Sequence, residues 1–178
     1  MSVTPPTYVG EMTNLSLEQH AGSRDGRFDV PSYISGYFDG EGCFSVSISP
    51  RPQLSVGWEV RPSVSVSQNE DRRQVVDMIH AYFACGSIRR DRSDLTIKWE
   101  VRNLSKIVES VLPHFRRWPL VSAKQSDVEL LERICEHMRM GRHREPHGLM
   151  VVAGLAASMN PSGIRRYSLD DIERSFSR

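Results

Sequence analysis

A chain of 178 residues with 39% hydrophobic content is long enough to form one domain with a sizeable core. Its apolar runs fall well short of the roughly 18 residues that span a bilayer, which excludes a membrane protein. Because the N-terminus also lacks a charged-then-apolar leader pattern, we expect an intracellular protein, of the cytoplasm or an organelle. The net charge is only +1, but residues 43–124 carry 13 Lys and Arg against eight Asp and Glu. Polyanion binding needs a local basic face and not a high global charge, so this composition is compatible with DNA binding.

The first segment, residues 1–28, is polar and rich in turn-forming Pro and Gly, without clear periodicity. We expect it to form a flexible N-terminal arm, with residues 29–178 as a single folded domain. An extra capping turn on the fold is the alternative.

Residues 32–44 combine small residues, two acids and bulky apolar residues in one short helix that runs straight into a strand. Glycine costs about 1 kcal/mol in a helix interior relative to alanine, so Gly36 and Gly40, four apart on one face, need a compensating benefit. Small residues at this spacing let a second helix approach closely, and we expect Gly42 to cap the helix in a left-handed conformation. Glu41 would then lie at the end of a tight helix pair. The alternative is a buried helix that ends beside a surface acid.

Alternation of apolar and polar residues predicts two antiparallel hairpins that enclose a helix. The first hairpin turns near residues 50–52, the helix is stopped by Gly86, and Leu95 points inward in the second hairpin. The predicted strands are residues 44–49, 54–67, 87–89 and 95–101. Their polar faces are rich in serine.

The C-terminal part is predicted to be helical. Asn103 caps one helix, Ser122 opens a long one and Pro146 starts another, while Ser168 and Asp171 form a capping box. The chain therefore belongs to the α+β class, with helices on one face of an antiparallel sheet and polar residues on the other.

Residues 34–42, Ile-Ser-Gly-Tyr-Phe-Asp-Gly-Glu-Gly, resemble the LAGLIDADG motif of homing endonucleases, with Gly36, Asp39 and Gly42 identical. In that family the motif helices form the interface between two half-proteins, and the second acid, which matches Glu41, binds the catalytic metal. The resemblance implies that the sheet forms a DNA-binding saddle. It also implies a site-specific endonuclease that cuts both strands of a long, pseudo-palindromic target, as in intron homing.

The motif occurs once, so the resemblance is to the single-motif, homodimeric branch. One carboxylate cannot clamp both the attacking and the leaving oxygen, whereas two copies of Glu41 could share Mg²⁺ or Mn²⁺ between them. Gly40 is the second metal-binding residue that the resemblance implies. The implied dimer interface consists of Ile34, Ser35, Gly36, Asp39 and Gly40.

The resemblance extends over about residues 31–177 and implies further active-site residues. In the run at 66–73 the matching positions are Gln68, which could order the attacking water, and Arg72. Lys124 matches the family's lysine at the start of the long helix, and both cations could stabilise charge on the scissile phosphate. Glu41 replaces the commoner Asp, and we expect Asp39 to orient the end of the motif helix.

The polar face of the sheet would straddle the major groove of double-stranded DNA. Arginine paired with guanine and carboxylate with cytosine are the expected direct contacts, and serine leaves room for bridging water. The candidate DNA-binding residues are Ser47, Ser49, Arg51, Glu59, Arg61, Ser63, Ser65, Arg89, Asp91, Thr96 and Lys98.

Two other interpretations remain open at this stage. The chain could be an RNA-binding intron maturase or a DNA-binding regulator that keeps the fold without cleavage.

The other is a zinc site formed by Cys135, His137, His143 and His147, although the spacing of these residues fits no standard site. The three cysteines of the chain suit reduced thiols.

Overall fold

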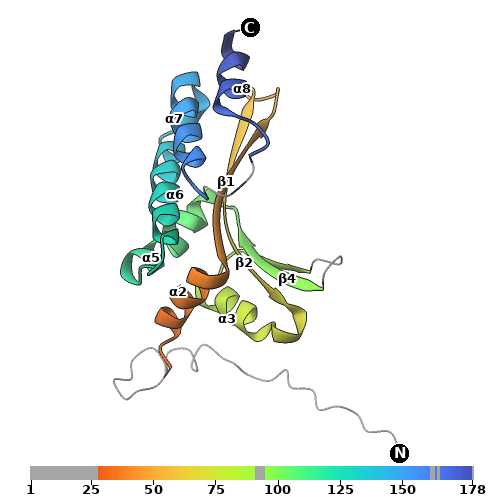
Figure 1. Cartoon of the computed structure of the whole chain (residues 1–178), viewed down its shortest axis with the longest axis vertical. Helices are drawn as coiled ribbons and strands as arrows, with labels where there is room; N and C mark the ends of the chain where they lie inside the picture. Colours follow the sequence, from red (N-terminus) through yellow and green to blue (C-terminus); the bar gives the residue numbers. More distant parts are fainter. Residues whose placement is uncertain (1–27, 91–94, 161–162, 164, 178) are drawn as a thin grey trace, which may run out of the picture.

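The computed structural model describes residues 28–90, 95–160, 163 and 165–177 (Figure 1). The predicted N-terminal arm, except for its last residue, and the candidate DNA contact Asp91 lie outside the described residues. Of the helices within these ranges, none has both the length and the apolar character needed to cross a membrane.

Helices and strands follow the order predicted for an α+β domain. In chain order they are α2 (Val30–Glu41), β1 (Gly42–Pro50), β2 (Trp58–Asn69), the 3-10 turn η1 (Glu70–Arg72), α3 (Gln74–Phe83), β3 (Ser87–Arg90), β4 (Thr96–Val101), α4 (Leu104–Lys106), the π-helical η2 (Ile107–Val111), α5 (Leu112–Arg117), α6 (Lys124–Arg139), η3 (Arg142–Arg144), α7 (Pro146–Ala157), α8 (Leu169–Arg174) and η4 (Ser175–Ser177).

The four strands form one antiparallel sheet in the order β1-β2-β4-β3. β1 pairs with β2 from Gly42 opposite Val66 to Pro50 opposite Trp58, and the other end of β2 pairs with β4. Helices α6 and α7 pack against β1, and α3 packs against β2 and β4. Figure 1 shows α5, α6 and α7 along one side of the long β1–β2 ribbon, with α2 and α3 at its lower end.

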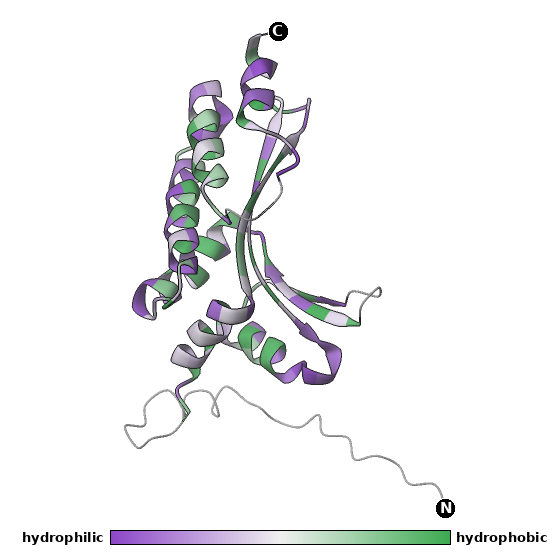
Figure 2. Ribbon diagram, in the orientation of Figure 1, coloured by the Kyte–Doolittle hydropathy of each residue, from purple (hydrophilic) through white to green (hydrophobic). Residues whose placement is uncertain are grey.

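The two faces of the sheet differ as the alternation predicts. One face joins the helices in a core of buried apolar residues, in which Phe38 of α2 contacts Phe44, Phe83, Trp99 and Phe115 edge-on or tilted. Burying each such side chain stabilises the fold by about 1.5–3 kcal/mol. Hydrophilic and hydrophobic residues are mixed along the strands, and the turn between β2 and α3 is strongly hydrophilic (Figure 2).

Several predicted boundaries are wrong by a few residues. β2 begins at Trp58 and not at residue 54, because residues 51–57 form a turn in which Gly57 has a φ of +69°. Leu95 is exposed and precedes β4, since its φ of +58° takes it out of the pleat. Helix α3, by contrast, ends before Gly86 as predicted, at Phe83, and Ala84 adopts the left-handed conformation.

The predicted helix caps are largely confirmed. The Asn103 side chain accepts a hydrogen bond from the Lys106 amide at 3.0 Å, and α7 starts at Pro146. Helix α6 starts at Lys124, whose amide donates to the Ser122 hydroxyl at 3.2 Å.

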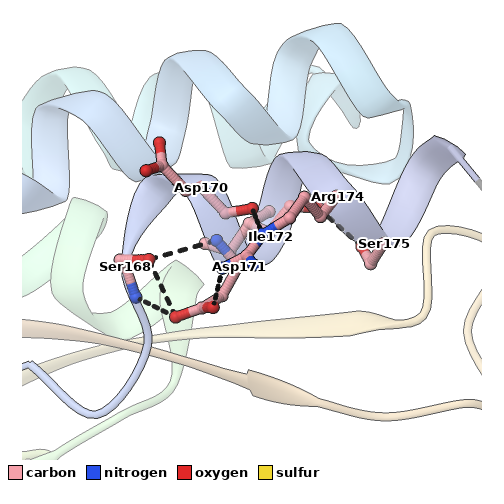
Figure 3. Close-up of polar contacts among 6 residues, drawn as sticks. All are labelled: Ser168, Asp170, Asp171, Ile172, Arg174 and Ser175. Atoms are coloured by element: carbon pink, nitrogen blue, oxygen red, sulfur yellow. Dashed lines mark hydrogen bonds and ion pairs between the residues drawn. The ribbon is translucent and has the colours of Figure 1, made fainter.

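The Ser168–Asp171 capping box opens α8 (Figure 3). The Ser168 hydroxyl accepts from the Asp171 amide at 3.1 Å, and Asp171 Oδ2 accepts from the Ser168 amide at 2.9 Å. At the end of this helix the Trp58 indole donates to the Ser175 hydroxyl at 2.8 Å, which holds the helix against the start of β2.

Candidate active site and nucleic-acid face

The transition from α2 to β1 is set by close packing against Phe38. Gly42 has an extended conformation with a φ of −72°, so the predicted left-handed cap is wrong. A Cβ at this position would lie 2.5 Å from Phe38 Cδ1 and 2.6 Å from the Phe38 carbonyl oxygen. Glycine is therefore required here by the close passage of the chain over the preceding helical turn.

Glu41 is the last residue of α2 and is exposed. Within the described ranges it forms no hydrogen bond and no ion pair. The Lys124 ammonium lies 3.2 Å from the carbonyl oxygens of both Phe38 and Gly40, the second of which belongs to the residue before Glu41. A cation is favourable at the C-terminal carbonyls of a helix, and the last turn of α2 has no basic residue of its own. Lys124 thus brings a positive charge from α6 to the backbone next to Glu41.

Asp39 joins the end of α2 to the segment before α6. Its carboxylate accepts hydrogen bonds from the Val121 amide at 3.1 Å, from the Ser122 amide and from the Ser122 hydroxyl. These hydrogen bonds, above all the one from the Ser122 side chain, hold the pKa of Asp39 below its usual value against a smaller opposing effect of burial. This is the orienting role expected for Asp39.

Gln68 lies at the end of β2 and is fixed against α2. Its amide nitrogen donates to the Tyr37 hydroxyl at 2.7 Å, and its amide oxygen accepts from the Asn69 backbone at 2.8 Å. Burial and, to a smaller degree, the Glu41 charge raise the pKa of Tyr37 against the effect of the Gln68 hydrogen bond. The structure therefore gathers Glu41, Gln68 and Lys124 around the last turns of α2.

Arg72 is not drawn into this group. It is exposed in the η1 turn and makes no hydrogen bond or ion pair with any other described residue. None of the described side chains therefore fixes its guanidinium.

One face of α2, which carries two glycines, is left uncovered by the described residues. Gly36 and Gly40 are exposed, and a Cβ built on either meets no atom within 4 Å. The exposed Tyr33 lies one helical turn before Gly36 on the same stripe. Val121, which is 95% exposed, lines a shallow pocket with Gly36. We call this surface of Tyr33, Gly36, Gly40 and Val121 the glycine face.

Two of the predicted interface residues, Ile34 and Ser35, point into the chain's own interior and away from the glycine face. Ile34 is 0% exposed in the chain's own core, so its side chain has no surface to give to a partner, and that part of the prediction is wrong. Ser35 is buried as well, and its hydroxyl donates to the Trp118 carbonyl at 2.6 Å.

Behind α2, Ser35 belongs to a directional chain of hydrogen bonds. Because its hydroxyl donates to Trp118, it accepts from Nε2–H of His114 at 3.1 Å, which leaves Nδ1 to accept from the Tyr82 hydroxyl at 3.0 Å. Burial lowers the pKa of His114 to about 4. A neutral histidine thus connects α2, α3 and α5, and nothing in the sequence pattern had indicated it.

The polar face of the sheet is only partly available to a ligand. Ser47, Arg51 and Arg61 are exposed, and Ser49, Ser63, Thr96 and Lys98 are half-buried. Glu59 forms ion pairs with Arg51 at 3.0 Å and with Arg61 at 2.7 Å.

Ser65 is 3% exposed and has almost no surface to offer to DNA, so its prediction as a DNA-binding residue is wrong. It lies opposite Glu100 of β4, a polar-face carboxylate that is 5% exposed. Arg89 and Lys98, two predicted DNA contacts, both form ion pairs with this carboxylate. Alternation predicted the direction of Glu100 but not that basic side chains would cover it.

The possible zinc ligands do not converge. Cys135 lies in the core, where burial raises the pKa of its thiol to about 12. Throughout the described part of the chain, no three His, Cys, Asp or Glu side chains are grouped so that they could hold a metal ion.

A family model described as LAGLIDADG endonuclease matches residues 34–135, from the motif helix through the sheet into α6. The chain belongs to the LAGLIDADG endonuclease family. The homing endonuclease I-ApeII of Aeropyrum pernix is 27% identical to this LAGLIDADG protein over 149 residues, which cover 80% of this chain and 87% of that protein. The probable intron-encoded endonuclease 2 of Neurospora crassa is 29% identical over 131 residues, or 73% of this chain, which spans only 29% of that relative.

The solved structure of the homing endonuclease I-TnaI has a TM-score of 0.71 and 27% identity with this LAGLIDADG protein, covering 83% of this chain and 95% of that one. The predicted α+β fold is confirmed. The motif occurs once here, which is consistent with the single-motif type of the family.

Proposed function

We propose that this LAGLIDADG protein is a site-specific endonuclease that cuts both strands of a DNA duplex as a homodimer in the presence of Mg²⁺. The observation that carries the proposal is the position of Glu41, an exposed carboxylate with no partner among the described residues, at the end of the helix whose glycine face is open. The names of I-ApeII and I-TnaI, both homing endonucleases, support the same activity.

The donor set suits a hard divalent cation. The Glu41 carboxylate is an oxygen ligand of the kind that Mg²⁺ and Mn²⁺ prefer, and the Gly40 carbonyl is another once the Lys124 ammonium turns from it towards the phosphate. When bound, such an ion stabilises charge on the phosphate and lowers the pKa of a bound water. One chain supplies a single acid here, because Asp39 is committed to Ser122. A second copy of Glu41 would complete the site.

The glycine face would allow the α2 helix of a second chain, with its own Glu41, to pack close to the first. Without side chains at Gly36 and Gly40, a second α2 helix can pack at shorter distance than ordinary residues allow. Two-fold packing on this face would place both Glu41 residues near the dimer axis. Ile34 has no part in this contact, whereas Tyr33 and Val121 flank it.

The neighbouring side chains have separate roles in the proposed reaction. Gln68, held by Tyr37, would orient the attacking water, and Lys124 would stabilise negative charge developing on the phosphate. Arg72, exposed and without a described partner, would reach the phosphate backbone only when DNA is bound. The polar face of the sheet would hold the duplex, as supported by the structure of the LAGLIDADG homing endonuclease I-LtrWI bound to target DNA, which is 28% identical.

Cleavage of a plasmid library that carries random inserts, with Mg²⁺ and the full chain, tests the proposal. We expect double-strand cuts at a defined sequence, and Glu41→Gln should abolish cutting while binding in Ca²⁺ is retained. The exposed acid Glu129→Gln on α6 serves as a matched control and should cut normally. Selective binding without any cutting by the unchanged protein would instead indicate a DNA-binding regulator, and preference for RNA would indicate a maturase.

A further inference from the structure

Glu100 occupies an unusual place for a carboxylate, at the centre of the polar face. It lies opposite Ser65 on β2, and opposite Ser87 on β3. Because both cross-strand neighbours are short, long side chains from nearby positions can fold over the carboxylate. Glu59, the other acid described above on this face, is half-buried, whereas Glu100 is buried.

Four side chains converge on the two oxygens of Glu100. Oε1 accepts from the Ser63 hydroxyl at 3.0 Å and from Arg102 Nη2 at 3.1 Å, and it lies 3.4 Å from the Lys98 ammonium. Oε2 accepts from Arg89 Nη2 and lies 2.9 Å from Arg102 Nε in an ion pair. Burial alone would raise the pKa of Glu100, but Ser63, Lys98 and Arg102 together hold it below its usual value. The carboxylate is therefore ionised at neutral pH.

The two arginines are held in different ways. Arg102 is paired with Glu100 through two nitrogens, a hydrogen bond from Nη2 and an ion pair through Nε, while 53% of its side chain is exposed. Arg89 is bound through Nη2 alone, and 60% of its side chain is exposed. A guanidinium has five N–H donors, so Arg89 keeps a fork of Nη1 and Nη2 donors that can pair with O6 and N7 of guanine.

We propose that Glu100 is a positioning residue for sequence readout, which fixes Arg89 for contact with a guanine in each half-site. The proposal rests on the proposed function, in which the polar face lies on DNA. An arginine without such an anchor pairs with any nearby phosphate, and phosphate contacts carry no sequence information. The anchor also removes in advance part of the entropy that a long side chain loses on binding. At the same time Glu100 withholds Arg102 and Lys98 from non-specific phosphate contacts.

Two substitutions separate the charge of Glu100 from its reach. Glu100→Gln removes the charge and releases three cations, so binding to an unrelated duplex should strengthen, and the slope of log K against log salt should steepen by about one phosphate contact. Glu100→Asp keeps the charge but withdraws the carboxylate from Arg89. We expect both variants to lose roughly tenfold of the preference at the guanine position, and Glu100→Asp to leave the salt slope unchanged.

The measurements are a binding selection from a random duplex library in Ca²⁺ and a salt titration on an unrelated duplex, with the full chain. Arg89→Ala identifies the base pair concerned. Glu109→Gln, an exposed acid in the helical layer, controls for net charge and should keep the selected sequence. Because Glu100 is buried, Ser63→Ala provides a milder way to loosen it, and it should shift the preference in the same direction as Glu100→Asp. Thermal melting checks that each variant is folded.

The outcomes distinguish this inference from the proposed function. If the unchanged protein selects no sequence, the proposed function itself fails. If it selects a site but the Glu100 variants keep its full profile, Glu100 only neutralises charge and the inference is overturned. The same conclusion follows if Arg89→Ala lowers affinity evenly at all positions. A loss of preference confined to the base pair that Arg89→Ala identifies is the expected result.

Discussion

The Asp39 carboxylate accepts hydrogen bonds from the Ser122 backbone amide at 3.1 and 3.2 Å, across 83 positions of sequence. This contact fixes the segment that leads into α6 against the end of the motif helix. Lys124 follows two residues later, and its ammonium reaches the Gly40 carbonyl. One acid of the motif therefore has a structural task, which leaves the other, Glu41, free for chemistry.

Asp39→Asn should separate these two tasks. The amide keeps one acceptor but loses the charge, so we expect the free energy of unfolding to fall by about 1 kcal/mol. Cleavage should fall further than DNA binding, because Lys124 is no longer held beside Glu41. Urea unfolding and a cleavage assay provide the two measurements. Asp77→Asn, which breaks an exposed ion pair with Arg73 on α3, should change neither by a comparable amount.

Gly36→Leu should prevent dimer formation without unfolding the chain. A Cβ at Gly36 meets no atom of the described residues within 4 Å, so there is room for the side chain beside them, whereas a closely packed second helix leaves none. Light scattering should report a monomer, and double-strand cutting should be lost. Gly154→Leu on α7, where a Cβ also meets no atom within 4 Å, is the matched control and should remain dimeric. An unchanged protein that is monomeric both in solution and on DNA would contradict the shared-site mechanism.

Gly42→Ala tests the steric reason for the end of α2. The new Cβ would overlap Phe38, which is itself fully buried, so neither group can move aside easily. We expect a loss of stability of about 1–3 kcal/mol, as for other overpacked positions. Gly40→Ala, two residues earlier in open space, should not destabilise the monomer and could stabilise it by up to about 1 kcal/mol. Equal effects of the two substitutions in urea unfolding would show that the overlap with Phe38 does not matter.

Much of the fold could be predicted from the sequence because it depends on local pattern. Alternation identified the strands and their two faces, and cap chemistry identified Asn103 and the Ser168–Asp171 box. The errors occur where the backbone leaves the regular pattern, as at Leu95 with its positive φ. Periodicity does not report such conformations, since a side chain of any type can occupy them when tertiary contacts compensate.

The site was predictable only in part, and for a related reason. The motif indicated Glu41, and the resemblance at the start of the long helix indicated Lys124, which the structure brings to the same end of α2. It could not indicate that Ile34 faces inward or that Ser65 lies under its neighbours. The direction of Ile34 depends on which side of α2 packs on the core, and the burial of Ser65 depends on how long side chains from adjacent strands fold over it. His114 was missed because a single histidine in an apolar helix gives no signal until its partners on other elements are known.

His114 makes stability depend on pH in a defined direction. Its pKa is about 4 in the folded protein because burial disfavours the charged imidazole, whereas an unfolded histidine titrates near 6.5. Between these values the unfolded state binds more protons, so the contribution of His114 is fully present above pH 6.5 and is lost as the pH falls towards 4. The loss should reach about 2–3 kcal/mol near the lower end of this range.

The difference between the unfolding free energies of the unchanged protein and His114→Gln isolates this effect, because the carboxylates titrate in both proteins and cancel. We expect the difference to shift by about 2–3 kcal/mol in favour of the variant between pH 7 and pH 4.5. Protonated His114 would have to give up its acceptor role towards the Tyr82 hydroxyl, and the Ser35 side of the chain would remain. Acidification should therefore loosen α3 from α5 before it frees α2, which amide hydrogen exchange at Tyr82 and Ser35 can compare. Parallel stability curves for the two proteins would show that His114 is not a buried neutral imidazole.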